Sequence, residues 1–233
     1  MSPALEVFFA PGKDDMNIQE IELASRFAWP ALEEQELPYG VLRYSSGYSK
    51  RANSLNLLPG IQAEPAEGQK HVMTVRLPAV TGNITNRGSG NSKEYSLPNW
   101  LQTYHRLSGL SGRERKIHRQ MLGKLPAEHC LLAVEDESGQ PLCCGFTVVV
   151  GRAAGLYNIV THADARGRGY GTQLASKLLT WAADNEATYA YLQVEAGNFP
   201  AIKLYRKLGF RTFYSYWYRT REFSGSGTQE SRR

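Results

Sequence analysis

The chain has 233 residues, 42% hydrophobic and 21% charged, with a formal net charge of +5. This is the composition of an ordinary globular protein, and the length allows one large domain or two small ones. No window of the sequence approaches the roughly 18 uninterrupted apolar residues that a membrane span needs. Residues 1–15 lack the pattern of a secretory signal. Basic side chains are scattered, with local density at 113–116 and 206–221, so a solvated surface is favoured over a nucleic-acid interface.

The first eighty residues contain one helix pattern and two strand patterns. Apolar residues recur at helical spacing from Ile18 to Trp29, and prolines follow this segment. The segments Gly40–Tyr44 and His71–Val80 are typical of strands, and the sequence between them is rich in turn and loop residues.

Residues 81–96 are rich in Gly, Asn and Ser and almost free of apolar residues. Such a composition is typical of a linker or an exposed loop. The sequence therefore predicts an N-terminal segment over 1–80, a linker over 81–96 and a domain over 97–223. Residues 224–233 contain no apolar side chain and are expected to be a disordered tail.

Beyond residue 96, helices and strands follow in a regular order. The pattern predicts two helices, a three-stranded antiparallel meander, a helix, a strand, a short helix and a final strand. The expected ranges in that order are 99–107, 113–122, 129–135, 142–150, 156–161, 169–183, 189–195, 200–208 and 210–223. The order also allows a strand before the first helix. The expected fold class is α/β (α+β) with a mixed sheet.

A glycine-rich loop, Arg166-Gly167-Arg168-Gly169-Tyr170-Gly171, connects the third meander strand to the following helix. Three glycines allow a bulky anion to approach the backbone, and the helix directs free N–H groups and its positive dipole end at that anion. The spacing differs from the dinucleotide GxGxxG, and the P-loop Gly-Lys-Ser/Thr is absent. The sequence therefore predicts a phosphate site of another kind.

Two motifs resemble those of the GCN5-related N-acetyltransferases. The loop matches Arg/Gln-x-x-Gly-x-Gly/Ala, and Asn198, Ala201 and the segment 204–210 match Asn-x-x-Ala-x-x-Leu-Tyr-x-Lys-x-Gly-Phe. The resemblance covers about residues 97–223. It implies a mostly antiparallel, twisted sheet with helices on both faces and a V-shaped split between the fourth and fifth strands.

The resemblance also implies acetyl-coenzyme A as the acyl donor. Its pyrophosphate would lie on the loop amides, and its pantetheine arm would lie along the strand before the loop, where unpaired backbone groups need partners. Asn198 would bond the pantetheine region, or cap the following helix, or both. The expected donor-binding residues are Ile159, Val160, Thr161, Arg166, Gly167, Arg168, Gly169, Tyr170, Gly171, Thr172 and Asn198.

Tyr205 resembles the general acid of the family, which protonates the departing thiolate; a phenol with a pKa of about 10 suits a thiol. Packing in the core is the other role open to this side chain. The strand 156–161 contains no carboxylate, so Glu195 is the nearest candidate base; the other role open to it, and the favoured one, is a surface or hydrogen-bonded carboxylate at the strand end. His162 could titrate near neutrality, and a substrate that binds already neutral would need no protein base.

The N-terminal segment resembles the opening of a tandem acetyltransferase group, in which a degenerate first copy precedes a working one. The similarity lies in 28–32, Arg43, 47–48 and 51–56. His71–Val75 would then be the closing strand of the first copy, which is too short to be complete. In this N-terminal segment, Arg51 and Asn53 would either shape the acceptor pocket or form hydrogen bonds within a loop.

These features predict an acetyl-coenzyme A-dependent N-acetyltransferase that acts by direct attack of a small-molecule or peptide amine. The alternative is a non-catalytic acyl-coenzyme A-binding regulatory module. Cys143 and Cys144 are expected on a strand away from the loop, which argues against a cysteine nucleophile. With Cys130 they make an odd number without CxxC spacing, which indicates a reducing cytoplasm and no metal site. No nucleic acid or membrane is expected as a partner, and the aromatic final strand would allow a homodimer.

Overall fold

The computed structural model describes residues 16–38, 40–49, 54–57, 69–77 and 90–216. The elements in chain order are α1 (Ile18–Ala28), β1 (Glu33–Leu37), β2 (Gly40–Tyr44), β3 (Ser54–Leu57), β4 (Lys70–Arg76), β5 (Asn91–Glu94), α2 (Leu97–Ser108), α3 (Gly112–Leu122), β6 (His129–Glu135), β7 (Pro141–Val150), β8 (Ala153–Thr161), the 3₁₀ helix η1 (Ala163–Ala165), α4 (Tyr170–Asp184), β9 (Tyr189–Glu195), α5 (Phe199–Lys207) and β10 (Arg211–Tyr216). None of the described helices is both long and apolar enough to cross a membrane.

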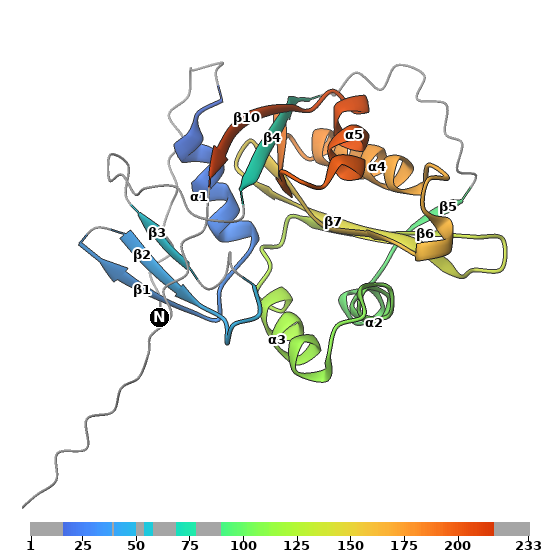
Figure 1. Cartoon of the computed structure of the whole chain (residues 1–233), viewed down its shortest axis with the longest axis horizontal. Helices are drawn as coiled ribbons and strands as arrows, with labels where there is room; N and C mark the ends of the chain where they lie inside the picture. The colour runs from blue at the N-terminus through green and yellow to red at the C-terminus, as the bar shows by residue number, and fades with distance from the viewer. Residues whose placement is uncertain (1–15, 39, 50–53, 58–68, 78–89, 217–233) are drawn as a thin grey trace, which may run out of the picture.

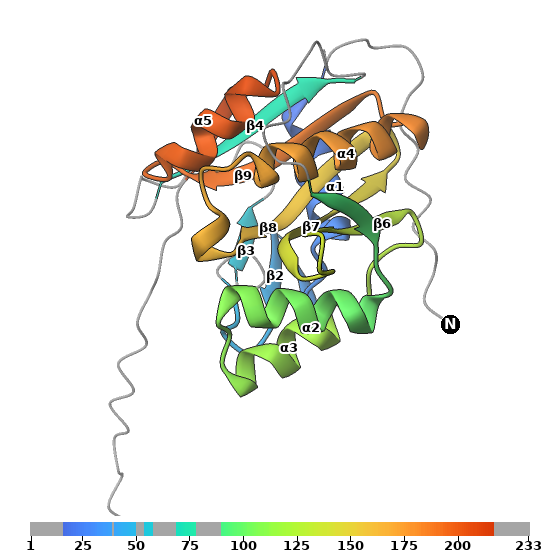
Figure 2. The ribbon, with the colours of Figure 1, turned by 90° about the vertical axis from the view of Figure 1, so that its right-hand side faces the viewer.

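The main sheet has seven strands in the order β10-β4-β9-β8-β7-β6-β5. Every neighbouring pair is antiparallel except β8 and β9, which are parallel. Helices α4 and α5 cover one face, and α1, α2 and α3 lie on the other (Figures 1 and 2). The expected fold class, a mixed and mostly antiparallel sheet with helices on both faces, is confirmed.

The helices and strands expected after residue 96 are present, with ends shifted by a few residues. The final part of the last expected strand, 217–223, lies outside the described residues. The strand allowed before the first helix is also present: β5 pairs with β6 although it lies in the expected linker. Its sequence, Asn-Ser-Lys-Glu, is mostly exposed, so no apolar pattern marks it as a strand. Strand β1 could not be predicted for the same reason, because it is almost wholly polar and exposed.

Strand β4 joins the N-terminal segment to the main sheet, where it lies between β9 and β10. The expectation that His71–Val75 closes a separate N-terminal copy is therefore wrong. Val72, Met73 and Thr74 are consecutive and all buried, which is typical of a central strand covered on both faces. The division at 81–96 stays a prediction, but strands from both sides of it form one sheet.

Helix α1 is held against a small antiparallel sheet, β1-β2-β3, by Arg43 of β2. The side chain of Arg43 is 2% exposed and pairs with Glu34 at 2.8 Å. Its guanidinium donates to the carbonyl oxygens of Trp29 at 2.5 Å and of Arg26 at 3.1 Å. These carbonyls end the helix and have no intrahelical donor, so Arg43 satisfies them and fixes the position of Trp29.

Strands β8 and β9 pair only over Ala153–Gly155 and Tyr189–Tyr191 and then diverge, which gives the expected split. Beyond the paired part, β8 carries a bulge against β7, at which Asn158 has φ +50°. Opposite the bulge, a Cβ on Gly145 would lie 2.7 Å from Ile159 Cγ1, so only glycine fits there. The bulge turns Asn158 toward the opening between the strands, where the candidate site lies.

Candidate active site

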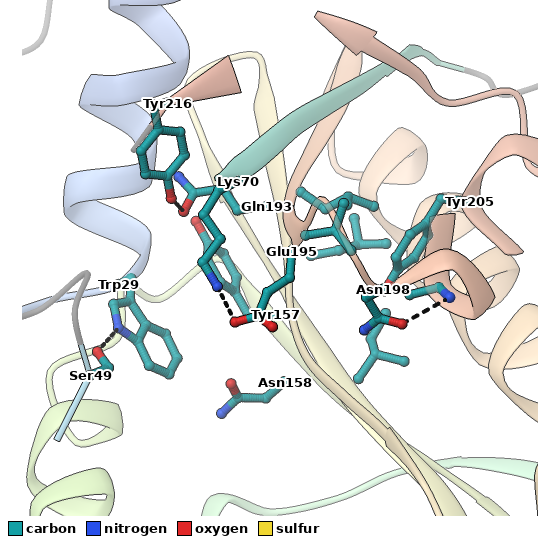
Figure 3. Close-up of a pocket in the computed structure, with 15 residues that line it drawn as sticks. Trp29, Ser49, Lys70, Tyr157, Asn158, Gln193, Glu195, Asn198, Tyr205 and Tyr216 are labelled. Carbon is teal, nitrogen blue, oxygen red and sulfur yellow. Dashed lines mark hydrogen bonds and ion pairs between the residues drawn. The ribbon is translucent and has the colours of Figure 1, made fainter. Parts of the chain in front are cut away.

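A cavity of about 530 Å³ occupies the split between β8 and β9 (Figure 3). One wall is the diverging part of β8 from Leu156 to Ile159, and another is β9 from Leu192 to Glu195. Helix α5 contributes Asn198 and Tyr205. The cavity thus brings together the expected residues Ile159, Glu195, Asn198 and Tyr205 from three separate elements.

The glycine-rich loop lies at the end of β8, beside this cavity. Gly167 and Gly169 have φ +75° and +94°, and Gly169 is the N-cap of α4. Within the described chain, the amides from Gly167 to Gly171 donate to no backbone carbonyl. A Cβ on Gly171 would lie 3.0 Å from Leu204 Cδ1, so the backbone there packs closely on α5. Free amides at a helix N-terminus form an anion site.

Tyr205 is 9% exposed, lies on α5 and packs against Phe210 with ring centroids 5.7 Å apart. Burial is the main cause that raises its pKa above the ordinary value, and the nearby Cys143 thiol raises it further. The hydroxyl therefore stays protonated at neutral pH. Core packing, one of the two roles that the sequence left open, applies to this side chain, which also lines the cavity. The general-acid role stays a prediction.

Asn198 is the N-cap of α5, because its Oδ1 accepts from the amide of Ala201 at 3.2 Å. The capping role expected from the sequence is confirmed, and the residue also lines the cavity. Its bond to a pantetheine arm stays a prediction.

Glu195, at the end of β9, forms an ion pair with Lys70 of β4 (Figure 3). The two residues are register partners of the adjacent strands. The Glu195 side chain is 72% exposed and reaches the open end of the cavity, whereas that of Lys70 is 20% exposed. Sequence reasoning missed Lys70 because 125 residues separate the two in the chain.

The N-terminal segment supplies an aromatic wall that the motifs did not predict. Trp29 stacks on Tyr157 with centroids 5.7 Å apart, and its Nε1 donates to Ser49 Oγ at 3.4 Å. On the other side, the Tyr216 hydroxyl donates to Gln193 Oε1 at 2.6 Å. All five side chains line the cavity. Arg51 and Asn53, for which the sequence left open a role in the acceptor pocket or in loop hydrogen bonding, lie outside the described residues.

The other expected donor-binding residues lie outside the cavity lining, beside it. These are Val160 and Thr161 on β8, and Arg166, Gly167, Arg168, Gly169, Tyr170, Gly171 and Thr172 in and after the loop. Arg168 lies over the Tyr170 ring, 5.5 Å from its centroid. His162 is also outside the lining; it caps η1 and lies 3.8 Å from Asp164.

The three cysteines are buried and free. Cys143 lies nearer the loop than expected, because its Sγ accepts from Thr161 Oγ1 at 3.2 Å across the β7–β8 pair. Burial raises the pKa of Cys143 to about 11 and that of Cys130 to about 12, and it also raises that of Cys144. Thiols of this kind are poor nucleophiles at neutral pH. Nowhere in the described ranges do His, Cys, Asp or Glu side chains gather as a metal site would require.

Iodoacetamide should therefore alkylate the native protein at about pH 8 at least ~100-fold more slowly than the unfolded chain, because burial and raised pKa values suppress the thiolates. Mass spectrometry of native and guanidinium-unfolded samples would measure this, with all three cysteines labelled only after unfolding. Rapid labelling of Cys143 in the native state would contradict this assignment.

A cavity in the split of the sheet, with a glycine loop of free amides beside it at a helix N-terminus, is an arrangement that an acyltransferase can use. Residues 95–210 match the model of the Acetyltransferase (GNAT) family. The chain belongs to this family, the GCN5-related N-acetyltransferases.

Individual relatives agree with this assignment. An uncharacterized N-acetyltransferase, YobR of Bacillus subtilis, is 25% identical over 87% of this chain and 98% of its own length. That similarity extends well beyond 95–210 into the N-terminal segment. A mycothiol acetyltransferase of Corynebacterium kroppenstedtii is 43% identical over 76 residues, which are 33% of this chain and 18% of that protein.

Solved structures show the same fold. A functionally unknown protein of Staphylococcus epidermidis superposes with a TM-score of 0.60 over 86% of this chain and 95% of its own, at 9% identity. A GCN5-related N-acetyltransferase of Sphaerobacter thermophilus superposes with a TM-score of 0.50, at 17% identity. The match covers 66% of this chain and 50% of that one.

Proposed function

We propose that the protein transfers an acetyl group from acetyl-coenzyme A to a primary amine by direct attack. The observation that carries this proposal is the convergence of Tyr205 and Glu195 on one cavity at the split between β8 and β9. A buried phenol on one side and a carboxylate on the other give the two proton-transfer groups that aminolysis of a thioester needs.

The chain offers a fitting place for the acyl donor. The free amides from Gly167 to Gly171, at the N-terminus of α4, suit a pyrophosphate. Beyond Gly155, no strand among the described residues pairs with the edge of β8 that faces β9, so an extended arm that carries amides can lie along this edge. Asn198 and Ile159 lie on either side of that opening.

Acetyl-coenzyme A supplies a thioester carbon that an amine can attack without an acyl-enzyme. As the new C–N bond forms and the C–S bond breaks, Tyr205 donates its proton to the departing sulfur. Glu195 takes the proton lost by the amine, directly or through water, and Lys70 neutralises the carboxylate between turnovers. The buried thiols take no part, in keeping with their raised pKa values.

A second candidate, a non-catalytic acyl-coenzyme A-binding module, is favoured by one observation: the carboxylate nearest the reaction centre is already paired with Lys70. A thiol-release assay separates the two functions. Purified protein and acetyl-coenzyme A are screened against primary amines, amino acid derivatives and peptides, with product detected by mass spectrometry. The proposed function expects amine-dependent thiol release, whereas tight acetyl-coenzyme A binding without release across the panel would favour the binding module.

A further inference from the structure

A buried pair of histidines lies behind the cavity, and Asn158 connects it to the cavity wall. His105 of α2 and His118 of α3 are 5% and 0% exposed, and their Nε2 and Nδ1 atoms are 3.1 Å apart. His118 Nε2 lies 2.8 Å from Nδ2 of Asn158, which lines the cavity. The rings of Tyr48, Tyr104 and Trp100 pack around His118 and keep it from solvent.

The direction of these hydrogen bonds follows from the chemistry of the amide. A side-chain NH₂ group can only donate, so His118 Nε2 is the acceptor and carries no proton. Neutral His118 then has its proton on Nδ1 and donates it to His105 Nε2. Burial lowers the pKa of His118 to about 3, and it lowers that of His105 together with Arg115 and Arg119. Both rings are thus neutral at ordinary pH, so His118 has the unprotonated nitrogen that the bond from Asn158 needs.

With its NH₂ held by His118, Asn158 presents its Oδ1 to the cavity. Figure 3 shows this oxygen on the side of the amide that faces Glu195, with the nitrogen turned away. No group in the described ranges donates to this Oδ1. The backbone contributes as well, because φ +50° belongs to the left-handed region, which Asn adopts more readily than most residues.

We propose that Asn158 binds the acceptor amine, whose N–H donates a hydrogen bond to Asn158 Oδ1. His118 is then a positioning residue that holds this oxygen toward the cavity. The inference rests on the proposed function and names the acceptor class: a primary amine on an apolar or aromatic body. Two acceptor groups, the Asn158 oxygen and the Glu195 carboxylate, suit a nitrogen with several N–H bonds. The rings of Trp29 and Tyr157 suit the apolar body.

Three variants test the two roles. Asn158→Gly removes the amide while tolerating the positive φ. His118→Phe keeps an aromatic ring among its neighbours but removes the acceptor nitrogen, and His118→Gln retains a side-chain oxygen that can accept from Asn158. The probe is 2-phenylethylamine, first of a panel of primary amines, with its N,N-dimethyl analogue as the control that lacks two N–H donors. Calorimetry on coenzyme A-loaded protein measures amine affinity, and thiol release measures KM and kcat.

We expect Asn158→Gly to weaken primary-amine binding by about 10- to 50-fold, as for a hydrogen bond to a charged group. KM should rise in proportion, with kcat and acetyl-coenzyme A affinity within about 3-fold of wild type. His118→Phe should weaken primary-amine binding by about 5- to 10-fold, and His118→Gln should retain most of the wild-type affinity. The dimethyl analogue should bind weakly to the wild type and to every variant.

Amine affinity unchanged in Asn158→Gly would overturn the proposal, and equal losses in His118→Phe and His118→Gln would overturn the positioning role. If coenzyme A binds but no primary amine of the panel does, the amine site is wrong. Failure of the proposed function is separate: it would appear as amine binding without thiol release in the wild type.

Discussion

Replacing Tyr205 by phenylalanine should lower kcat by about 10²- to 10³-fold while changing the dissociation constant of acetyl-coenzyme A by less than about 3-fold. Loss of a general acid costs a factor of this order, since the leaving thiolate must then take its proton from water. The ring packing on Phe210 is retained in the variant, so the cavity should keep its shape. Steady-state thiol release, together with calorimetric titration of acetyl-coenzyme A, would measure both quantities.

Tyr216→Phe is the matched control. Its hydroxyl bonds Gln193 in the same cavity, but the proposal gives it no part in proton transfer, so kcat should change by less than about 3-fold. Because the Tyr205 pKa is raised, the acid form persists through neutral pH, and loss of activity through its ionisation belongs above about pH 10. Equal turnover of Tyr205→Phe and wild type would remove the general-acid role.

The parts of the site that the sequence predicts are those carried by short, local motifs. The glycine loop, the capping Asn198 and Tyr205 each lie within one turn or one helix, and their spacing is sufficient to place them. The fold class follows for the same reason, because most strands after residue 96 have an apolar pattern. Tyr205 and Asn198 both lie on the cavity wall, and the chemistry assigned to them stays a prediction.

The rest depends on contacts between distant segments. Lys70 meets Glu195 only because β4 inserts beside β9, and Trp29 reaches Tyr157 only because Arg43 ties the end of α1 to β2. The bond between Asn158 and His118 needs both a strand bulge and the packing of α3. A polar residue in a strand and a histidine in an amphipathic helix carry no signal of such pairing.

A chain that begins at residue 81 should fail to fold to the native sheet, although the linker composition of 81–96 predicts a boundary there. Removing β4 separates β9 from β10, because each pairs with β4 and the two are not adjacent. It also removes Val72 and Met73, both fully buried, which alone contribute about 3–6 kcal/mol. A whole domain is typically stable by only about 5–15 kcal/mol, so the loss of this strand is a large share.

Soluble yield, far-UV circular dichroism and thermal unfolding of the 81–233 chain would measure this effect. Co-expression with the 1–80 segment is the control, because β4 supplied in trans can pair with the same two strands and should restore soluble, cooperatively folding protein. A folded 81–233 chain with unchanged stability would show instead that the boundary at 81–96 separates independent units. Since Trp29 and Lys70 also line the cavity, even a folded 81–233 chain would lack one wall of the acceptor site. The N-terminal segment is therefore expected to be needed both for the stability of the main sheet and for the wall of the acceptor site.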